Sequence, residues 1–154
     1  MASSTTLPVR AALAPIAGAI GVTVLCVISA VIFLRWRGAE QHRALQISTT
    51  KCRGGDKEGC DTLRDACLKR SAEACVNLAE VYLSPGSNRD PQEGARLLGE
   101  ACLHRNADAC FRAGTMYAAG TDIPKNPAEA KDSFQRGCYL GNDKACTAQE
   151  SLAP

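Results

Sequence analysis

The sequence predicts an all-α protein, namely an α/α solenoid of short helix-turn-helix repeats stapled by disulfides and preceded by one transmembrane helix. Three observations lead to this prediction. Eight of the nine cysteines fall into four pairs, each with seven residues between the partners. The cysteines also recur with a period near 35 residues, which is typical of two-helix repeats. Finally, residues 11–34 contain no charged side chain.

The charge-free segment, 11–34, is long enough to cross a bilayer, because a helix of this length extends roughly 36 Å. A cleaved signal peptide is the competing interpretation, but its apolar region is normally only about 7–15 residues long. The segment runs into Phe33-Leu34-Arg35-Trp36-Arg37, which is typical of an interfacial anchor. We therefore expect a retained membrane anchor, in which Cys26 is a small apolar residue rather than a reactive thiol.

Two pairs of small residues in this segment, Ala14/Gly18 and Ala17/Gly21, have a spacing that lets a second membrane helix pack closely. This spacing predicts a weak homodimer through the transmembrane helix. The alternative is that these residues are filler in a single isolated span.

Charge bears on both partner and orientation. Residues 47–154 carry 14 basic and 15 acidic side chains, and this near neutrality argues against a nucleic-acid partner. Three arginines follow the apolar segment and one precedes it, which would place the repeats in the cytoplasm. Paired cysteines require an oxidising compartment instead. We follow the cysteines and expect a single-pass membrane protein with periplasmic or extracytoplasmic repeats; the mitochondrial intermembrane space is the alternative.

The domain boundaries are set by the anchor and the cysteines. The expected parts are a tail (1–10), the anchor (11–34), a polar juxtamembrane linker (35–51) and the repeat domain (52–154), itself divided into an abbreviated cap (52–66), two repeats (67–101 and 102–137) and a half repeat (138–154).

Each repeat is expected to contain two helices. Asp90-Pro91-Gln92-Glu93 and Asn126-Pro127-Ala128-Glu129 have the pattern of helix starts, with a capping side chain, a proline in the first position and a glutamate in the first turn. Small and apolar residues recur three and four positions apart, which predicts one buried stripe per helix. We assign Tyr82 and Tyr117, which end the first helices, to the core rather than to a ligand site.

The cysteine spacing predicts which helices are linked. Two cysteines eight positions apart in one helix would be about 12 Å apart, whereas a disulfide needs Cα atoms within about 7 Å. The partners must therefore lie on successive helices joined by a turn. The predicted bonds are Cys52–Cys60, Cys67–Cys75, Cys102–Cys110 and Cys138–Cys146.

Cys60 and Cys67 are only seven positions apart, which predicts one helix near Asp56–Lys69 that serves two disulfides and acts as an amino-terminal cap. Zinc is the rival use of the cysteines. Zinc sites favour knuckles with two to four residues between cysteines, which are missing here, and His42 and His104 show no ligand spacing. We expect no metal and no cofactor.

These features resemble the Sel-one-like repeat, a relative of the tetratricopeptide repeat, in its cysteine-rich, Hcp-like branch. The residues that carry the resemblance are the Ala-Cys pairs at 74–75 and 109–110, Tyr82, Tyr117, Lys125-Asn126-Pro127 and the Ala130/Phe134/Gly137 triplet. The resemblance covers residues 52–150 and implies a solenoid whose concave face scaffolds protein complexes. Some cysteine-rich members are labelled β-lactamases or penicillin-binding proteins, so a protein of that type is the alternative function.

The residues favour a membrane-anchored scaffold for protein–protein interaction over an enzyme. A serine β-lactamase would need a Ser-x-x-Lys motif together with supporting Ser and Lys motifs. Because we identify no such set of motifs, we assign no catalytic residue. His104 is assigned as a cation at a helix end rather than a base. The expected partner is another protein or peptide, bound at non-core positions of the first helices. These positions are Val76, Asn77, Glu80, Phe111, Arg112 and Thr115.

Overall fold

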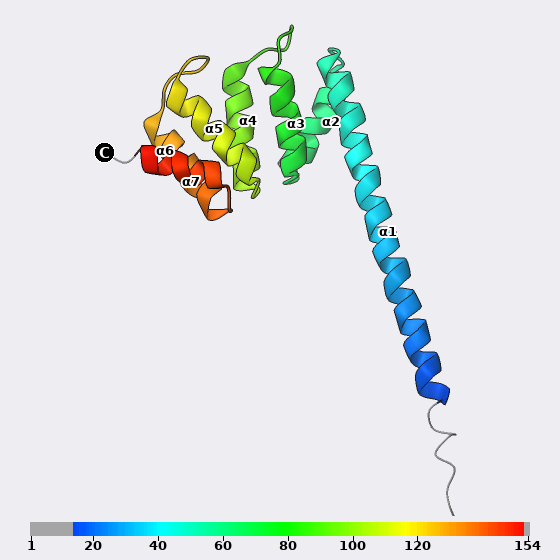
Figure 1. Ribbon diagram of the computed structural model, residues 1–154. Coiled ribbons are helices and arrows are strands. Elements are labelled where there is room, and N and C mark those ends of the chain that lie inside the picture. Colours follow the sequence, from blue (N-terminus) through cyan, green and yellow to red (C-terminus); the bar gives the residue numbers. More distant parts are fainter. Residues whose placement is uncertain (1–13, 153–154) are drawn as a thin grey trace, which may run out of the picture. The chain divides into compact units, whose positions relative to one another are not determined.

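The computed structural model describes the backbone of residues 14–152, with side chains described from residue 24 onward. It divides into two units, 1–42 and 43–154. Within the described residues every regular element is a helix (Figure 1). The helices are α1 (Ala14–Arg53), α2 (Lys57–Leu68), α3 (Ala72–Leu83), α4 (Pro91–Leu103), α5 (Ala107–Ala119), α6 (Pro127–Tyr139) and α7 (Asp143–Ser151).

In the first unit, α1 exposes a series of large apolar side chains between Val24 and Trp36. Near the middle of α1, the Phe33 and Trp36 rings stack at 6.5 Å between centroids, and the Arg37 guanidinium lies 5.4 Å from the Phe33 centroid. Among the described residues, no helix is long and apolar enough to cross a membrane.

The predicted span, 11–34, lies partly outside the described residues: 11–13 are not described, and the side chains of 14–23 are not described either. The latter range holds the small-residue pairs Ala14/Gly18 and Ala17/Gly21, so their predicted helix pairing stays a prediction.

The predicted linker, 35–51, is helical throughout because α1 continues through it. Its last turns belong to the second unit, where Leu45 packs against the main core and Ser48 and Thr49 are buried. A Cβ atom on Gly59 would lie 2.7 Å from the Cβ of Lys51, so α2 approaches this end of α1 closely. At the end of α1, the other polar residues of this segment thus form the exposed side of a packed helix.

The helices of the second unit begin where side chains can cap them. Asp56, Ser71, Asp90, Asn106, Asn126 and Asn142 each accept a hydrogen bond from a backbone N–H two or three residues ahead. Pro91 and Pro127 occupy the first positions of α4 and α6. The predicted starts at Asp90 and Asn126 are confirmed, and so is the single cap helix, observed as α2.

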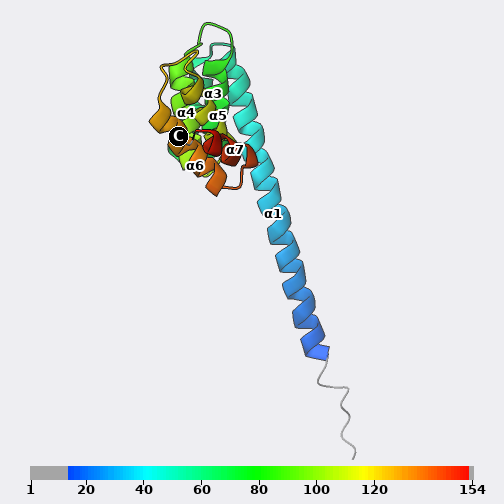
Figure 2. The ribbon, with the colours of Figure 1, turned by 60° about the vertical axis from the view of Figure 1, so that its left-hand side comes forward.

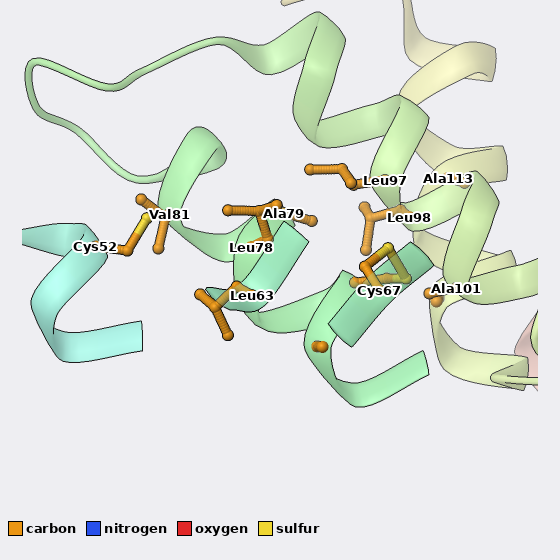
Figure 3. Packing of buried hydrophobic residues seen from close by; sticks show 13 residues of the cluster. Cys52, Leu63, Cys67, Leu78, Ala79, Val81, Leu97, Leu98, Ala101 and Ala113 are labelled. Carbon is orange, nitrogen blue, oxygen red and sulfur yellow. A yellow bond between two sulfur atoms is a disulfide. The ribbon is translucent and has the colours of Figure 1, made fainter. Parts of the chain in front are cut away.

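The core is built from small residues with a few leucines. Leu63, Leu78 and Leu98 are fully buried and contribute one large side chain each from α2, α3 and α4 (Figure 3). A second cluster centres on Phe134, which packs against Phe111 at 6.0 Å between ring centroids. Tyr82 packs against the first cluster and Tyr117 against both, as expected for core residues.

Successive helices of the second unit pack as neighbours, and α4 also contacts α6 while α5 contacts α7. This alternation places the turns α2–α3, α4–α5 and α6–α7 at one edge of the unit, which we call the staple edge. The longer loops after α3 and α5 lie at the opposite edge (Figures 1 and 2). The unit is therefore a solenoid with two distinct edges.

Candidate functional site

Four turns of the same construction hold the second unit together. Each is closed by one disulfide between cysteines eight positions apart, with Cα atoms separated by 4.5–4.7 Å. The bonds join Cys52 to Cys60, Cys67 to Cys75, Cys102 to Cys110 and Cys138 to Cys146. These are the pairs that the equal spacing predicts.

The backbone of these turns is also repeated. In the turn after α4, Arg105 N–H donates to the Cys102 carbonyl at 3.0 Å and Asn106 N–H donates to the Ala101 carbonyl at 3.1 Å. This pair of bonds is a Schellman motif, and the other three turns contain it too. The second donor, Asn106, is at the same time the N-cap of α5. Only the three residues His104, Arg105 and Asn106 thus separate α4 from α5.

The Schellman motif needs a left-handed residue three positions after the first cysteine of each pair. Gly55 and Gly141 occupy this position in the first and last turns, whereas Arg70 and Arg105 occupy it in the middle two, each with φ of 68°. Left-handed backbone is unfavourable for a side chain other than glycine. Arg70 and Arg105 therefore occupy positions where glycine would adopt the backbone conformation with less strain.

An exposed apolar residue follows the first cysteine of three of the pairs. Leu68, Leu103 and Tyr139 are 74%, 56% and 87% exposed, although the cysteines that precede the two leucines, Cys67 and Cys102, are buried. Because the position recurs once per repeat, the three side chains form a row along the staple edge. Apolar side chains gathered in this way on a surface are typical of interaction sites.

Two hollows lie between the members of this row. The first hollow has a volume of about 390 Å³ and is lined by Leu68, Arg70, Glu100, Leu103 and His104. The second has a volume of about 480 Å³, and its lining includes Leu103, Arg105, Asp132, Arg136, Tyr139 and Leu140. Leu103 thus separates two neighbouring hollows.

The sequence analysis did not find this surface, although a signal for it exists. Cys67-Leu68-Lys69-Arg70 and Cys102-Leu103-His104-Arg105 share the pattern Cys-Leu-x-Arg at the repeat period. In a sequence, a leucine next to a buried cysteine is ordinarily assigned to the core. Its exposure here follows from its position as the last residue of the helix, which the pattern alone does not indicate.

A further depression lies between α4 and the loop before α6, and its lining includes Glu93, Arg96, Tyr117 and Lys125. Arg96 donates two hydrogen bonds to the Glu93 carboxylate, each 2.7 Å long, and these bonds lower the pKa of Glu93. Burial, followed by the nearby Glu129 carboxylate, raises the pKa of Tyr117. Two of the charges here, those of Glu93 and Arg96, are already paired with each other.

The predicted binding residues lie on α3 and α5, and most of them already make contacts inside the domain. Val76 packs against the first core cluster and Phe111 against the second. Glu80 and Arg112 form an ion pair between the two helices, with 2.6 Å between Oε1 and Nη2.

The remaining two predicted residues differ from each other. The Thr115 hydroxyl donates to the Phe111 carbonyl at 2.8 Å. The Nδ2 atom of Asn77 is buried and has no hydrogen-bond partner among the described residues. The role of the six residues in partner binding stays a prediction.

One motif of the β-lactamase type was missed in the sequence. Ser48-Thr49-Thr50-Lys51 has the Ser-x-x-Lys spacing. It lies in the last turns of α1, where Ser48 is buried and Lys51 is exposed. Supporting Ser-Asp-Asn and Lys-Thr-Gly motifs do not accompany it in the sequence, so the spacing alone assigns no nucleophile.

Other candidate groups are dispersed. Among the described residues, no three His, Cys, Asp or Glu side chains gather as metal ligands would. Cys26 is an exposed thiol outside the disulfides. His104 lies at the carboxyl end of α4 with its Nε2 atom 3.4 Å from Glu100 Oε1, which is the helix-end position predicted for it.

No protein-family model matches the chain, and no curated protein matches its sequence. Among solved structures, the chain is similar to Helicobacter pylori cysteine rich protein B. The likeness has a TM-score of 0.50 at 24% sequence identity and covers 70% of this chain and 93% of that one. The chain therefore has the helical-repeat fold of that cysteine-rich protein, which is the fold that the resemblance in the sequence predicts.

Proposed function

We propose that the chain is a protein-interaction module, tethered to a membrane and working on its oxidising side. The observation that carries the proposal is the surface repetition in the second unit: residues in equivalent places of successive repeats form a row along the staple edge. Solenoids commonly use such repeated surfaces to bind extended partners.

The tether is proposed from the amino-terminal half of α1. Apolar side chains from Val24 to Leu34 are exposed on it, and a helix that is apolar on its exposed sides needs a covering environment. Trp36 and the neighbouring arginines, Arg35 and Arg37, suit the interface between lipid and water. The charge-free run of 11–34 supports a bilayer as that environment.

The compartment is proposed from the four disulfides, because structural disulfides persist in oxidising surroundings. Protease added to intact cells or spheroplasts tests this topology. The second unit should be degraded from outside, whereas its survival until the membrane is broken would place it in the cytoplasm.

Site-specific photo-crosslinking of the full chain tests the interaction itself. A photoreactive residue is placed at Leu103 on the staple edge, at Asn77 on α3, and at exposed Lys57 at the start of α2 as the control. A discrete protein adduct from Leu103 or Asn77, with none from Lys57, is the expected result. Failure of both positions to give an adduct would refute the interaction function.

A further inference from the structure

We propose that the two hollows of the staple edge bind an extended, acidic peptide segment of a partner protein, with one apolar side chain entering each hollow and a carboxylate entering the second, beside Arg105. The inference rests on the proposed function, because it names the surface and the class of partner that this function would use.

The two hollows are built from equivalent residues of successive repeats. Leu68 and Arg70 bound the first hollow on one side, and Leu103 and Arg105 take the same places in the second. On the other side, Leu103 of the first hollow corresponds to Tyr139 of the second. The apolar row and the arginine position therefore repeat from one hollow to the next, whereas Glu100 of the first hollow is replaced by Arg136 in the second.

The charges of the second hollow favour a carboxylate. In the first hollow, His104 lies beside Glu100; in the second, Arg136 donates to Asp132 at 2.6 Å. Arg70 and Arg105 belong to none of the ion pairs between described residues. The second hollow thus has one internal ion pair and one uncompensated guanidinium, that of Arg105, a group whose planar donors match a carboxylate. In the first hollow the Arg70 guanidinium shares the lining with the Glu100 carboxylate, because His104 is charged only when it is protonated.

The backbone adds an independent argument. Arg70 and Arg105 adopt left-handed φ values, which is unfavourable for a side chain, and strained residues concentrate where they serve binding. Both guanidinium groups follow an exposed leucine by two positions. The same cation is thus retained beside the same apolar side chain in both repeats.

The spacing of the helices indicates an extended ligand. Packed neighbouring helices such as α4 and α6 lie about 8–10 Å apart, and an extended chain advances about 3.3 Å per residue. Equivalent side chains of the ligand should therefore recur about every third residue. A second copy of this chain fits less well, because a two-fold pairing of the edges would bring arginines against arginines.

The probe is a fluorescein-labelled peptide, Ser-Leu-Asp-Ser-Leu-Asp-Ser, titrated into the oxidised full chain and followed by fluorescence anisotropy. The control peptides replace both aspartates with lysine or both leucines with serine. We expect saturable binding of the acidic peptide and at least tenfold weaker binding of both controls. Equal binding of the aspartate and lysine peptides, or no binding of the aspartate peptide, would overturn the proposal.

The variant is Arg70→Gly/Arg105→Gly, which removes both cations and suits the left-handed backbone, so its thermal midpoint should stay level or rise. It should bind the acidic peptide at least tenfold more weakly, whereas the control variant Lys57→Ala should bind it as the unmodified chain does. Unchanged affinity in the double variant would contradict the role of the arginines.

Other occupants give different results. Amide shifts in NMR spectra confined to Asn77 and Arg112 would move the site to α3 and α5 and overturn this surface, while the proposed function would stand. A dimer that sedimentation equilibrium detects and that Leu103→Ser dissociates would overturn the proposal in favour of a second copy of the chain. Displacement of the peptide by anionic vesicles would overturn it in favour of a lipid surface.

Discussion

Glu80 and Arg112 join the first helices of two successive repeats by an ion pair 2.6 Å long. Both side chains keep more than a third of their surface exposed, so solvent screens the attraction. The pair therefore contributes little to folding, and Arg112 can be replaced to test partner binding without unfolding the domain.

We expect Asn77→Ala/Arg112→Ala to keep its thermal midpoint within a few degrees of the unmodified chain. Exposed ion pairs contribute at most about 1 kcal/mol, and neither residue lies in the buried stripe. Thermal unfolding followed by circular dichroism is the measurement, with Arg112→Ala alone as the matched control. A loss above about 2 kcal/mol would mean that this face supports the fold.

Two helical glycines should respond to alanine in opposite directions. A Cβ on Gly114 would lie 2.7 Å from Cδ1 of Phe134, whereas a Cβ on Gly99 would meet nothing within 4 Å. Gly114→Ala should therefore destabilise the domain by about 1–3 kcal/mol through overpacking. Gly99→Ala should stabilise it by about 0.5–1 kcal/mol through helix propensity. Urea unfolding of both variants decides, and equal effects would refute the packing argument.

Acid should weaken the domain partly through Glu93. Its pKa is lowered, chiefly by the hydrogen bond from Arg96, so its contribution is present above the unfolded-state value near 4.5 and is lost as the pH falls through the lower folded-state pKa. Arg96→Gln should therefore lose less stability than the unmodified chain between pH 5 and 3. The difference should stay under about 1 kcal/mol because the pair is partly exposed.

The control for this measurement is Lys131→Gln, which removes an exposed cation from α6. Its loss of stability between the same pH values should match that of the unmodified chain. If Arg96→Gln also matched it, the Glu93–Arg96 pair would not be the source of the acid sensitivity.

Removing one staple should have a measurable cost. In the chain-entropy model a loop of nine residues is worth roughly 2–3 kcal/mol, so Cys102→Ala/Cys110→Ala should lower the free energy of unfolding by that amount. Peptide mapping without reduction should recover the four pairs and find Cys26 as a thiol. Mixed pairings would contradict the predicted staples, and eight reduced cysteines in native membranes would contradict both the staples and the oxidising compartment.

The repeat architecture could be predicted from the sequence because the patterns that indicate it lie between residues close together in the chain. Equal cysteine spacings force a turn between partners, and the seven-residue interval between Cys60 and Cys67 leaves room for a single helix, observed as α2. The helical course of 35–51 was not predictable in this way. It depends on Leu45 packing against the core and on the close approach of Gly59, which are contacts between segments.

The candidate site was harder to predict for a related reason. Arg70 and Arg105 are ordinary surface residues in a sequence, and only the backbone reveals that both are left-handed. Phe111 was expected on the binding face, yet its ring packs against Phe134. Helical position separates inside from outside along one helix, but it does not say which outer positions a neighbouring helix will cover.

The double role of Asn106, which closes the turn after α4 and caps α5, has a consequence for how such a protein can change over time. Because the turns between stapled helices are this short, a duplicated block of about 35 residues would insert in the same orientation as its neighbours. The contacts of those neighbours would stay intact. Each duplication would add one hollow to the staple edge. A partner would then need a longer stretch of matching side chains for each added repeat. Selectivity could therefore change through the number of repeats, without a change in the residues that line any one hollow.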